Sequence, residues 1–265
     1  MVCREQKDGN VRKALHMGEI AAEKGAQIIC FQELFNTHWF PRDIHEGNFL
    51  LAEDLDGPTL STMKNLAKTK EVALICPFFE KAGDRYFNTA AVIDQQGAIA
   101  GTYRKIHVPQ IPLWEERAYF SPGDKEFPVF DLGSVKIGVQ ICWDNFFPEG
   151  TRVLALRGAQ IVFAPTAAAF ASQQRWLKVI AANAIVNGLF IVRVNRVGDE
   201  PKQNFYGMSF CISPEGDLVD EPTGLQEGIL LAEIDLDEIS RVRKEWPFLK
   251  DRRPDAYARL DQQEQ

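Results

Sequence analysis

Short apolar runs alternate with helix-forming segments along most of this chain, and that alternation restricts its fold more than any other feature. Runs typical of buried strands cover residues 27–31, 72–79, 159–165 and 189–198. Helical spacing is found between and after them, at about residues 10–24, 59–70, 150–158 and 173–187 and in a charged segment from about 236. The alternation indicates a protein of the α/β class.

Three connections carry the turn residues of β-hairpins. They lie within residues 86–105, 127–142 and 207–222, and the first two turn at 94–97 and 131–134. Because hairpins join antiparallel strands, a purely parallel sheet is not expected. The sequence therefore predicts mixed sheets with helices on their outer faces, for example two sheets packed as a sandwich between helix layers.

Charge and composition exclude several classes of protein. The 265 residues include 37 acidic and 30 basic side chains, and this net charge of −7 argues against a nucleic-acid or acidic-membrane surface. The sequence contains no run of 18 apolar residues and no signal peptide. Five widely spaced cysteines without a CxxC pair suit a reducing compartment, so we expect a cytoplasmic location. No linker-like stretch divides the chain, so we expect one domain over residues 1–265.

Three residues that can carry chemistry stand at the ends of apolar strand runs. Glu33 follows "IICFQ", Lys105 lies in "TYRKIHVP" and Cys142 follows "GVQI". Strand ends are where residues distant in the sequence converge. A thiol needs a base or a lowered pKa to react, a partly buried carboxylate can take its proton, and an ammonium can stabilise an oxyanion by about 3 kcal/mol. The three residues can thus supply a nucleophile, a base and an electrostatic stabiliser without histidine.

Each of these residues also has a plainer interpretation. A cysteine at a buried strand end usually acts as a small hydrophobic residue, and a single glutamate or lysine usually lies on the surface. We assign Cys30, Cys76 and Cys211, which lie inside apolar runs, to the structural class. Four scattered histidines show no HxH or HExxH spacing, so no metal site is predicted. Spacing alone leaves both interpretations open.

The sequence around the three residues resembles the nitrilase superfamily of carbon–nitrogen hydrolases along nearly the whole chain. The matching segments are "CFQELF", "YFNTAAVIDQQGAIAGTYRKIHVP", "VKIGVQICWDNFFPEGTRVLALRGAQIVFAPT", "NGLFIVRVNRVG" and "DRRPDAY". The resemblance implies a four-layer α-β-β-α sandwich with mixed sheets, usually assembled as a homodimer or a higher homo-oligomer. It also implies a catalytic triad of Glu33, Lys105 and Cys142 that requires no metal or organic cofactor.

The resemblance further implies a reaction. Glu33 would take the thiol proton, and Cys142 would attack the carbon of an amide or carbamoyl group. Lys105 and the backbone N–H of Trp143 would hold the oxyanion that forms. Ammonia would leave with the proton from Glu33, and water would hydrolyse the thioester-type intermediate.

Two segments point to a branch of the superfamily. "CWDNFFPE" and "DRRPDAY" are similar to the N-carbamoylputrescine amidase-like branch, whose members split an N-carbamoyl amine into amine, carbon dioxide and ammonia. A small N-carbamoyl amine or a primary amide is thus the expected substrate. A cationic amine would need an acidic partner, and Asp144, Glu115 and Glu149 are candidates, each of which could equally be a structural hydrogen-bond acceptor. Glu116 in "PLWEERAYFSPGD" matches a second glutamate common in the superfamily and would orient Lys105 or the substrate.

The sequence leaves several alternatives open. The chain could be a nitrilase acting on a nitrile, or an N-carbamoyl amino acid amidohydrolase with Arg175 as a candidate partner for the substrate carboxylate. It could pass the intermediate to an amine as an acyltransferase. It could also be a non-catalytic binding or scaffold protein on the same fold, although the three intact triad positions argue against this.

The chain departs from the resemblance in places. "QIPLWEERAY" replaces a glycine-containing loop that usually borders the substrate, and Trp39 and Phe40 either narrow the pocket or pack in the core. Members usually start with a buried strand that would be ending at Met1, so we expect strand residues upstream or a compensating rearrangement. We expect the helix and tail from about 236 to 265 to lie in subunit contacts.

Overall fold

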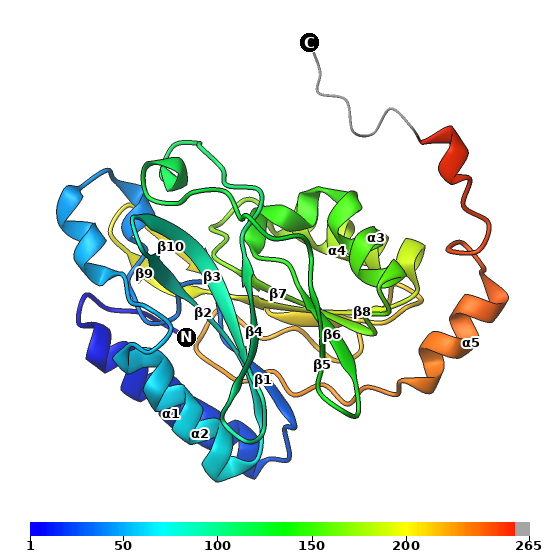
Figure 1. Cartoon of the computed structure of the whole chain (residues 1–265), viewed down its shortest axis with the longest axis horizontal. Helices are drawn as coiled ribbons and strands as arrows, with labels where there is room; N and C mark the ends of the chain where they lie inside the picture. Colours follow the sequence, from blue (N-terminus) through cyan, green and yellow to red (C-terminus); the bar gives the residue numbers. More distant parts are fainter. Residues whose placement is uncertain (258–265) are drawn as a thin grey trace.

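Two β-sheets pack face to face between two pairs of helices (Figure 1). The computed structural model describes residues 1–257. Helices α1 (Lys7–Glu23) and α2 (Pro58–Lys70) cover the outer face of the first sheet, and α3 (Pro148–Leu156) and α4 (Gln173–Asn187) cover that of the second. This arrangement confirms the predicted α-β-β-α sandwich.

The first sheet has four strands in the order β1-β2-β3-β4. Its strands are β1 (Ile28–Cys30), β2 (Ala73–Ala82), β3 (Arg85–Ile93) and β4 (Ile99–Arg104). β1 runs parallel to β2, and the other neighbours are antiparallel. The predicted hairpin at 86–105 is formed by β3 and β4, so this sheet is mixed as expected.

The second sheet has five strands in the order β11-β8-β7-β6-β5. Its strands are β5 (Val129–Asp131), β6 (Lys136–Val139), β7 (Ile161–Thr166), β8 (Phe190–Asn195) and β11 (Phe210–Ile212). The three central strands are parallel and both edge strands are antiparallel. A separate ribbon pairs β9 (Val197–Glu200) with β10 (Gln203–Tyr206). The 3-10 helices are η1 (Phe40–Arg42), η2 (Glu46–Leu51), η3 (Glu116–Ala118), η4 (Cys142–Phe146) and η5 (Pro254–Ala256).

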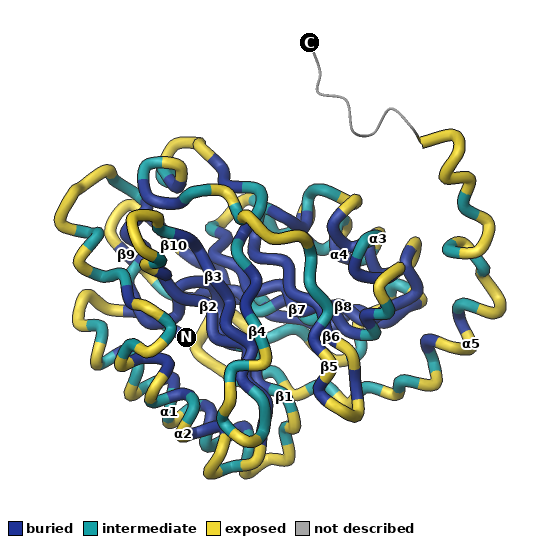
Figure 2. Tube along the Cα trace, viewed as in Figure 1, coloured by how far each residue is buried: buried dark blue, intermediate teal, exposed yellow. Residues whose placement is uncertain are grey.

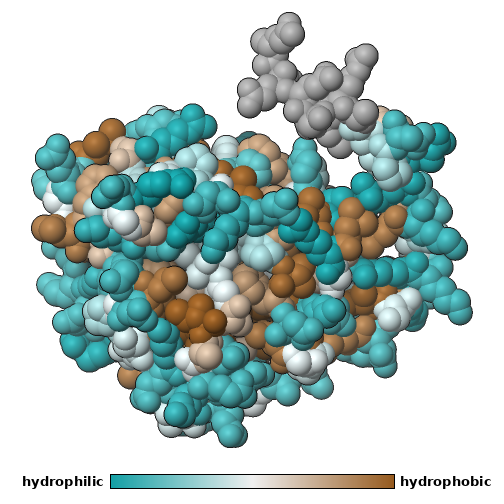
Figure 3. Space-filling view, in the orientation of Figure 1, coloured by the Kyte–Doolittle hydropathy of each residue, from teal (hydrophilic) through white to brown (hydrophobic). Residues whose placement is uncertain are grey.

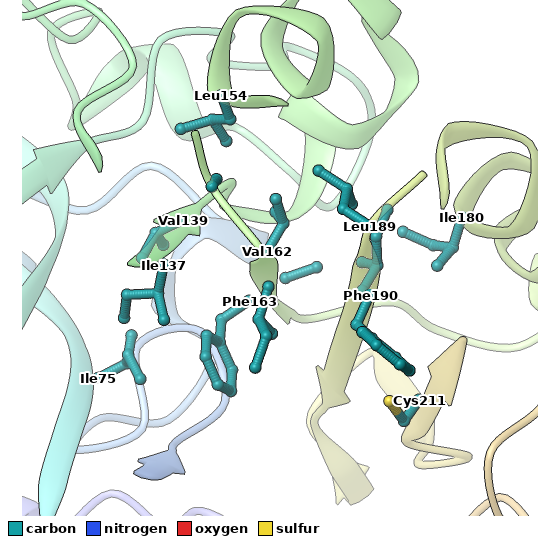
Figure 4. Packing of buried hydrophobic residues seen from close by; sticks show 14 of the residues in the cluster. Ile75, Ile137, Val139, Leu154, Val162, Phe163, Ile180, Leu189, Phe190 and Cys211 are labelled. Carbon is teal, nitrogen blue, oxygen red and sulfur yellow. The ribbon is translucent and has the colours of Figure 1, made fainter. Parts of the chain in front are cut away.

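Strand periodicity divides the apolar residues between two cores. Ile75 of β2 points into the layer between the sheets, where it meets Ile137, Val139 and Phe163 (Figure 4). Its neighbour Cys76 points the other way, into the core beneath α1 and α2. Because successive strand residues face opposite sides, a strand buried on both faces reads as a continuous apolar run.

The helix expected from about residue 10 begins earlier, at Lys7, and the Asn10 side chain lies within it, donating to the carbonyls of Arg4 at 2.7 Å and Asn36 at 3.2 Å. The hairpin predicted at 207–222 is present but short. Its return strand is reduced to a single bridge between Ile212 and Leu218, supported by the hydrogen bond from the Val219 amide to the Cys211 carbonyl at 3.0 Å.

The periphery has two further features. A cavity of about 910 Å³ opens beside β1, lined by β1, by β8 and by the extended segment 228–234, and its lining includes neither Glu33 nor Cys142. Helix α5 (Asp237–Glu245) packs on the end of the sandwich through buried Ile239 and Val242, and Arg243 donates to the Gly188 carbonyl. Residues 246–257 form an arm beyond α5, and most of this arm is exposed (Figures 1 and 2). Apolar surface is visible on this face over the sheet region and between the sandwich and the arm (Figure 3).

Candidate active site

Glu33 stands on a sharp turn just past β1. Leu34 adopts a left-handed backbone with φ of 50°, a conformation that costs a non-glycine residue about 1–2 kcal/mol. The guanidinium of Arg196 holds this turn by donating to the carbonyl of Glu33 at 3.1 Å and to that of Leu34 at 2.8 Å. The fully buried Glu33 side chain is thereby fixed in position.

Lys105 follows β4 and joins two buried carboxylates. Its Nζ donates to Glu33 Oε1 at 2.8 Å and to Glu116 Oε2 at 2.6 Å, and none of the three side chains is exposed. Burial alone would lower the pKa of Lys105, but the carboxylates of Glu116 and Glu33 outweigh burial and raise it. The ammonium therefore stays charged at neutral pH.

Glu116 lies in η3, within the loop that follows Lys105. Burial raises the pKa of Glu116, and the neighbouring Lys105 opposes that rise only in part. Two buried carboxylates share one ammonium here, so a neutral cluster needs one additional proton. The raised pKa of Glu116 places that proton on Glu116.

Cys142 is the first residue of η4, just after β6, and has a left-handed conformation with φ of 46°. Its carbonyl accepts from Asn145 Nδ2 at 2.9 Å, and the Asn145 carbonyl accepts in turn from Asn183 Nδ2 at 2.8 Å. The side chain is 4% exposed. Burial raises the pKa of the thiol, the negative charge of Glu33 raises it further, and Lys105 lowers it only in part. The thiol is thus protonated at rest and needs a base when it reacts.

Unpartnered oxygen atoms show where this cluster can act. Glu33 Oε1 accepts from Lys105 and, at 2.8 Å, from Asn88 Nδ2, whereas Glu33 Oε2 has no hydrogen-bond partner among residues 1–257. The Cys142 thiol is close enough for the charges of Glu33, Lys105 and Glu116 to act on it. The cluster therefore combines a free carboxylate oxygen, a protonated thiol and a permanent cation, which is what proton transfer, nucleophilic attack and oxyanion stabilisation require.

The residues that follow Cys142 differ in their surroundings. Trp143 is half-buried, and its ring contacts that of Phe146 with centroids 5.4 Å apart. Asp144 is fully buried and accepts from the Tyr103 hydroxyl at 2.7 Å and the His107 amide at 2.9 Å, and its Oδ1 pairs with His107 Nδ1 at 2.8 Å. These contacts favour a structural role for Asp144 over substrate binding. They also give His107 a structural role as a partner of Asp144.

Two of the remaining candidates, Glu115 and Trp39, lie at the loop that carries Glu116, and Glu149 lies on α3. Glu115 is half-buried and accepts from Gln110, whereas Glu149 is exposed on the first turn of α3. Trp39 is fully buried, and its Nε1 donates to the Leu113 carbonyl at 3.0 Å. Trp39 therefore supports this loop from the core, and Phe40 packs in the same apolar cluster.

Three side chains that support the cluster were not identified from the sequence. Asn88 binds the Glu33 carboxylate, Arg196 holds the turn after Glu33, and Asn145 holds the Cys142 carbonyl. Asn88 and Arg196 did carry a signal, because each interrupts an otherwise apolar strand segment, "YFNTAAV" and "VRVNRVG". A buried polar residue in such a segment must find a partner, although the sequence does not show which one.

Other cysteines and possible metal ligands lie apart from this cluster. Cys76 and Cys211 are buried, and burial raises the pKa of each thiol, to about 12 for Cys211. Within residues 1–257, no group of three or more His, Cys, Asp and Glu side chains is arranged to hold a metal ion. Nor is any helix in the described part of the chain long and apolar enough to cross a membrane.

Comparisons with known proteins point to one family. The sequence profile of the family described as carbon-nitrogen hydrolase matches residues 3–244. An N-carbamoylputrescine amidase of Solanum lycopersicum is 39% identical over 271 residues, covering 96% of this chain and 90% of the relative. A citrullinase of Francisella tularensis is 36% identical, covering 89% of this chain and 87% of its own length. The crystal structure of a carbon-nitrogen hydrolase from Helicobacter pylori superposes with a TM-score of 0.94 at 34% identity, covering 98% of this chain and 95% of that one.

Proposed function

This chain belongs to the carbon–nitrogen hydrolase family, and from that premise we propose that it releases ammonia from the carbamoyl group of a small N-carbamoyl compound or from a primary amide. The relatives named above act, by their names, on N-carbamoylputrescine and on citrulline, which both carry a carbamoyl group. The observation that carries the proposal is the buried cluster in which Glu33 Oε2 is free beside a protonated Cys142 thiol and the Lys105 ammonium.

The first half of the proposed reaction forms the covalent intermediate. Glu33 Oε2 takes the thiol proton while Cys142 Sγ bonds to the carbonyl carbon. The oxyanion is held by Lys105 Nζ and by the backbone N–H of Trp143. Protonated Glu33 then returns the proton to the leaving nitrogen, the carbon–nitrogen bond breaks, and ammonia departs. Glu33 is left ionised and the carbonyl carbon is bonded to sulfur.

The second half regenerates the thiol. Glu33 takes a proton from a water molecule, whose oxygen bonds to the carbonyl carbon of the intermediate. The carbon–sulfur bond breaks, and the thiolate recovers a proton from Glu33. An N-carbamoyl substrate yields a carbamate that decomposes to amine and carbon dioxide. Glu116 stays protonated throughout and orients the Lys105 ammonium through Oε2.

The test is ammonia release from the purified protein. The panel contains N-carbamoylputrescine, citrulline, N-carbamoyl-β-alanine, an aliphatic amide and a nitrile, assayed with wild type and with Cys142→Ala. The control variant is Cys76→Ala, which alters a fully buried cysteine in the other core. We expect turnover of at least one carbamoyl or amide compound in wild type and in the control, and none in Cys142→Ala.

Other outcomes would replace the proposal. Turnover of the nitrile alone would identify a nitrilase. A new amide formed when an amine is added would identify an acyltransferase. Failure to turn over the whole panel, together with an inert Cys142 thiol, would favour a binding or scaffold protein.

We also infer that the chain works as a homo-oligomer in the cytoplasm. The arm at residues 246–257 extends beyond α5 and carries apolar side chains with large exposed fractions, 62% for Trp246 and 41% for Phe248. A second copy of the chain would cover them. All five cysteines are free, which supports a reducing compartment.

A further inference from the structure

Arg193 is a fully buried charge inside the apolar strand β8. Its Nη2 donates to the Tyr206 hydroxyl at 2.8 Å and its Nη1 to the Met208 carbonyl at 3.3 Å, while its Nε has no partner in the described residues. No aspartate or glutamate of residues 1–257 pairs with this guanidinium. Arg193 is therefore a buried cation whose counter-ion is missing.

The neighbouring Arg196 shows how this fold neutralises a buried guanidinium. Arg196 is equally buried, but its Nη1 pairs with Glu200 Oε1 at 2.6 Å. It also donates to the carbonyls of Leu34 at 2.8 Å and Thr37 at 3.1 Å. Two arginines three positions apart thus have opposite surroundings, and only Arg193 is left uncompensated.

Aromatic rings surround the Arg193 guanidinium. Its central carbon lies 4.7 Å from the ring centre of Trp176, 5.3 Å from that of Tyr206 and 5.5 Å from that of Phe210. Cation–π contacts offset part of the lost hydration of the charge, but they do not replace a paired anion. A buried charge kept in this state marks a candidate functional site.

The position of Arg193 in the sheet places it beside the nucleophile. Arg193 pairs with Ala164 of β7, and Gln140 at the end of β6 continues the same row across the sheet. Two strand spacings separate Arg193 from Gln140, which is about 10 Å, and Cys142 follows two residues later. A thiolate formed at Cys142 would raise the pKa of the Arg193 guanidinium.

We propose that Arg193, together with the hydroxyl of Tyr206, binds a carboxylate of the substrate while the carbamoyl group of the same molecule reacts at Cys142. This inference rests on the proposed function and narrows it. The substrate is then a ureido acid, a compound with a carbamoyl-amino group at one end and a carboxylate at the other. Guanidinium and hydroxyl groups are strong donors to carboxylate oxygens.

The Tyr206 hydroxyl supports this assignment. It accepts from Arg193 Nη2 and keeps its own proton to donate. The nearby Ser172 hydroxyl already donates to the Ala169 carbonyl at 2.8 Å. A carboxylate placed beside the Arg193 guanidinium and the Tyr206 hydroxyl would meet donors from both and would neutralise the guanidinium.

A surface loop covers this group of donors. Residues 167–172 connect β7 to α4, and the Phe170 ring packs on that of Tyr206 at 5.8 Å while remaining 46% exposed. Ala171 in the same loop is left-handed with φ of 70°. The loop is held to β10 by a bridge between Ala169 and Phe205 and by the hydrogen bond from the Phe170 amide to the Asn204 carbonyl at 3.1 Å, and entry of a substrate would open these contacts.

The acidic residues nearby do not offer a comparable site for a cationic amine. Asp144 receives hydrogen bonds from the Tyr103 hydroxyl and the His107 amide, and Glu200 pairs with Arg196. Both carboxylates are therefore already compensated. The uncompensated charge beside Cys142 is positive, and it selects for an anion.

The test compares three carbamoyl compounds of similar length. These are 4-ureidobutanoate, which ends in a carboxylate, the neutral butylurea, and N-carbamoylputrescine, which ends in an ammonium. We expect wild type to prefer 4-ureidobutanoate over butylurea in kcat/KM. Arg193→Met should reduce that preference on the order of 100-fold, mainly through KM, because it removes one partner of a buried charge pair.

A matched control distinguishes loss of the carboxylate site from the general effect of removing a half-buried or buried arginine. Arg243 is half-buried, has no carboxylate partner in the described part of the chain and donates to the Gly188 carbonyl at 2.9 Å from α5. Arg243→Met should leave the preference for the anionic substrate as in wild type. Arg193→Met should unfold at the same or a higher temperature than wild type in the absence of substrate, since it removes an uncompensated charge.

Binding measurements keep the inference testable if no compound is turned over. Calorimetry of Cys142→Ala should show tighter binding of 4-ureidobutanoate than of butylurea, and that difference should vanish in the Cys142→Ala, Arg193→Met double variant. This pattern without turnover in wild type would overturn the proposed function but not the carboxylate site. A preference unchanged by Arg193→Met, or an equal loss of kcat for all three compounds, would overturn the carboxylate site.

Discussion

At the scale of single residues, the protonation of three buried side chains decides what the cluster can do. Burial raises the pKa of the Cys142 thiol, so attack must be coupled to proton removal. Burial also raises the pKa of Glu116, which lets it donate to or orient its neighbours without adding a second negative charge. The free oxygen Oε2 of Glu33 is then the available base. Two carboxyl groups that are hydrogen-bonded to the same lysine thus have different roles, Glu33 as the base and Glu116 as the group that orients Lys105.

Glu116→Gln tests this division of roles through stability. The folded state keeps a proton on Glu116 that the unfolded chain releases above the ordinary value of 4.5. The contribution of this group is therefore present in full below pH 4.5 and is lost as pH rises toward the raised pKa. We expect the free energy of unfolding of wild type to fall more steeply with pH in that window than that of Glu116→Gln, by up to about 1.4 kcal/mol per pH unit. Denaturant titrations at several pH values measure this, and equal slopes would contradict it.

The sequence predicted much of the cluster but not its supports. Glu33, Lys105 and Cys142 were singled out because each ends an apolar strand run, and the structure brings their side chains together. The choice of Glu116 over Glu115 required a family resemblance. Arg193 could not be assigned from the sequence, because the missing counter-ion of a buried charge is a property of three-dimensional packing.

At the scale of secondary structure, the nucleophile depends on close packing between β6 and α3. Gly138 of β6 lies four residues before Cys142, and a Cβ atom added there would stand 2.7 Å from the side-chain methyl carbons of Leu154. Real Cβ contacts do not occur at that distance, so α3 can approach the strand only because residue 138 is glycine. This packing also sets the position of η4, which begins at Cys142.

Gly138→Ala should therefore reduce both stability and activity. We expect a loss of about 1–3 kcal/mol in the free energy of unfolding, from overpacking against α3, and a lower kcat from displacement of the nucleophile. Chemical denaturation and steady-state kinetics measure the two effects. Gly228→Ala is the matched control, because a Cβ at residue 228 would have no neighbour within 4 Å. If Gly138→Ala matched wild type in stability and in kcat, β6 and α3 could move apart without loss, and the prediction would be wrong.

Elements with a strong local pattern were predictable from the sequence, and those formed by distant contacts were not. The helix predicted at 173–187 is α4, and the turn predicted at 94–97 joins β3 to β4. The segment 207–222 has hairpin turn residues, yet only Phe210–Ile212 pairs with β8, and the return strand is reduced to one bridge. Whether an edge strand such as β11 forms depends more on the strand beside it than on the residues of the edge strand itself.

At the scale of the whole molecule, the arm after α5 is the feature that a single chain leaves unexplained. Trp246 and Phe248 stack on each other with centroids 5.8 Å apart, yet both remain largely exposed. Neighbouring exposed aromatic residues on a projecting segment are typical of a protein–protein contact. We infer that the arm of one copy packs against another copy.

Replacing both aromatic residues should weaken this assembly. We expect wild type to sediment at twice its monomer mass of 29.9 kDa or more, and Trp246→Ser with Phe248→Ser to shift it toward the monomer. Analytical ultracentrifugation measures the change. Leu50→Ser is the control, because Leu50 is 88% exposed at a site away from the arm. Wild type sedimenting as a monomer would contradict the inference.

The central claim is that Cys142 forms a covalent intermediate with the carbon of a carbamoyl or amide group. Mass spectrometry of acid-quenched wild type during turnover, followed by peptide mapping, tests it most directly. The account predicts an added mass equal to that of the substrate minus ammonia, located on the peptide that contains Cys142 and absent from Cys142→Ala. Steady turnover without such an adduct, together with ammonia release by Cys142→Ala, would contradict the account.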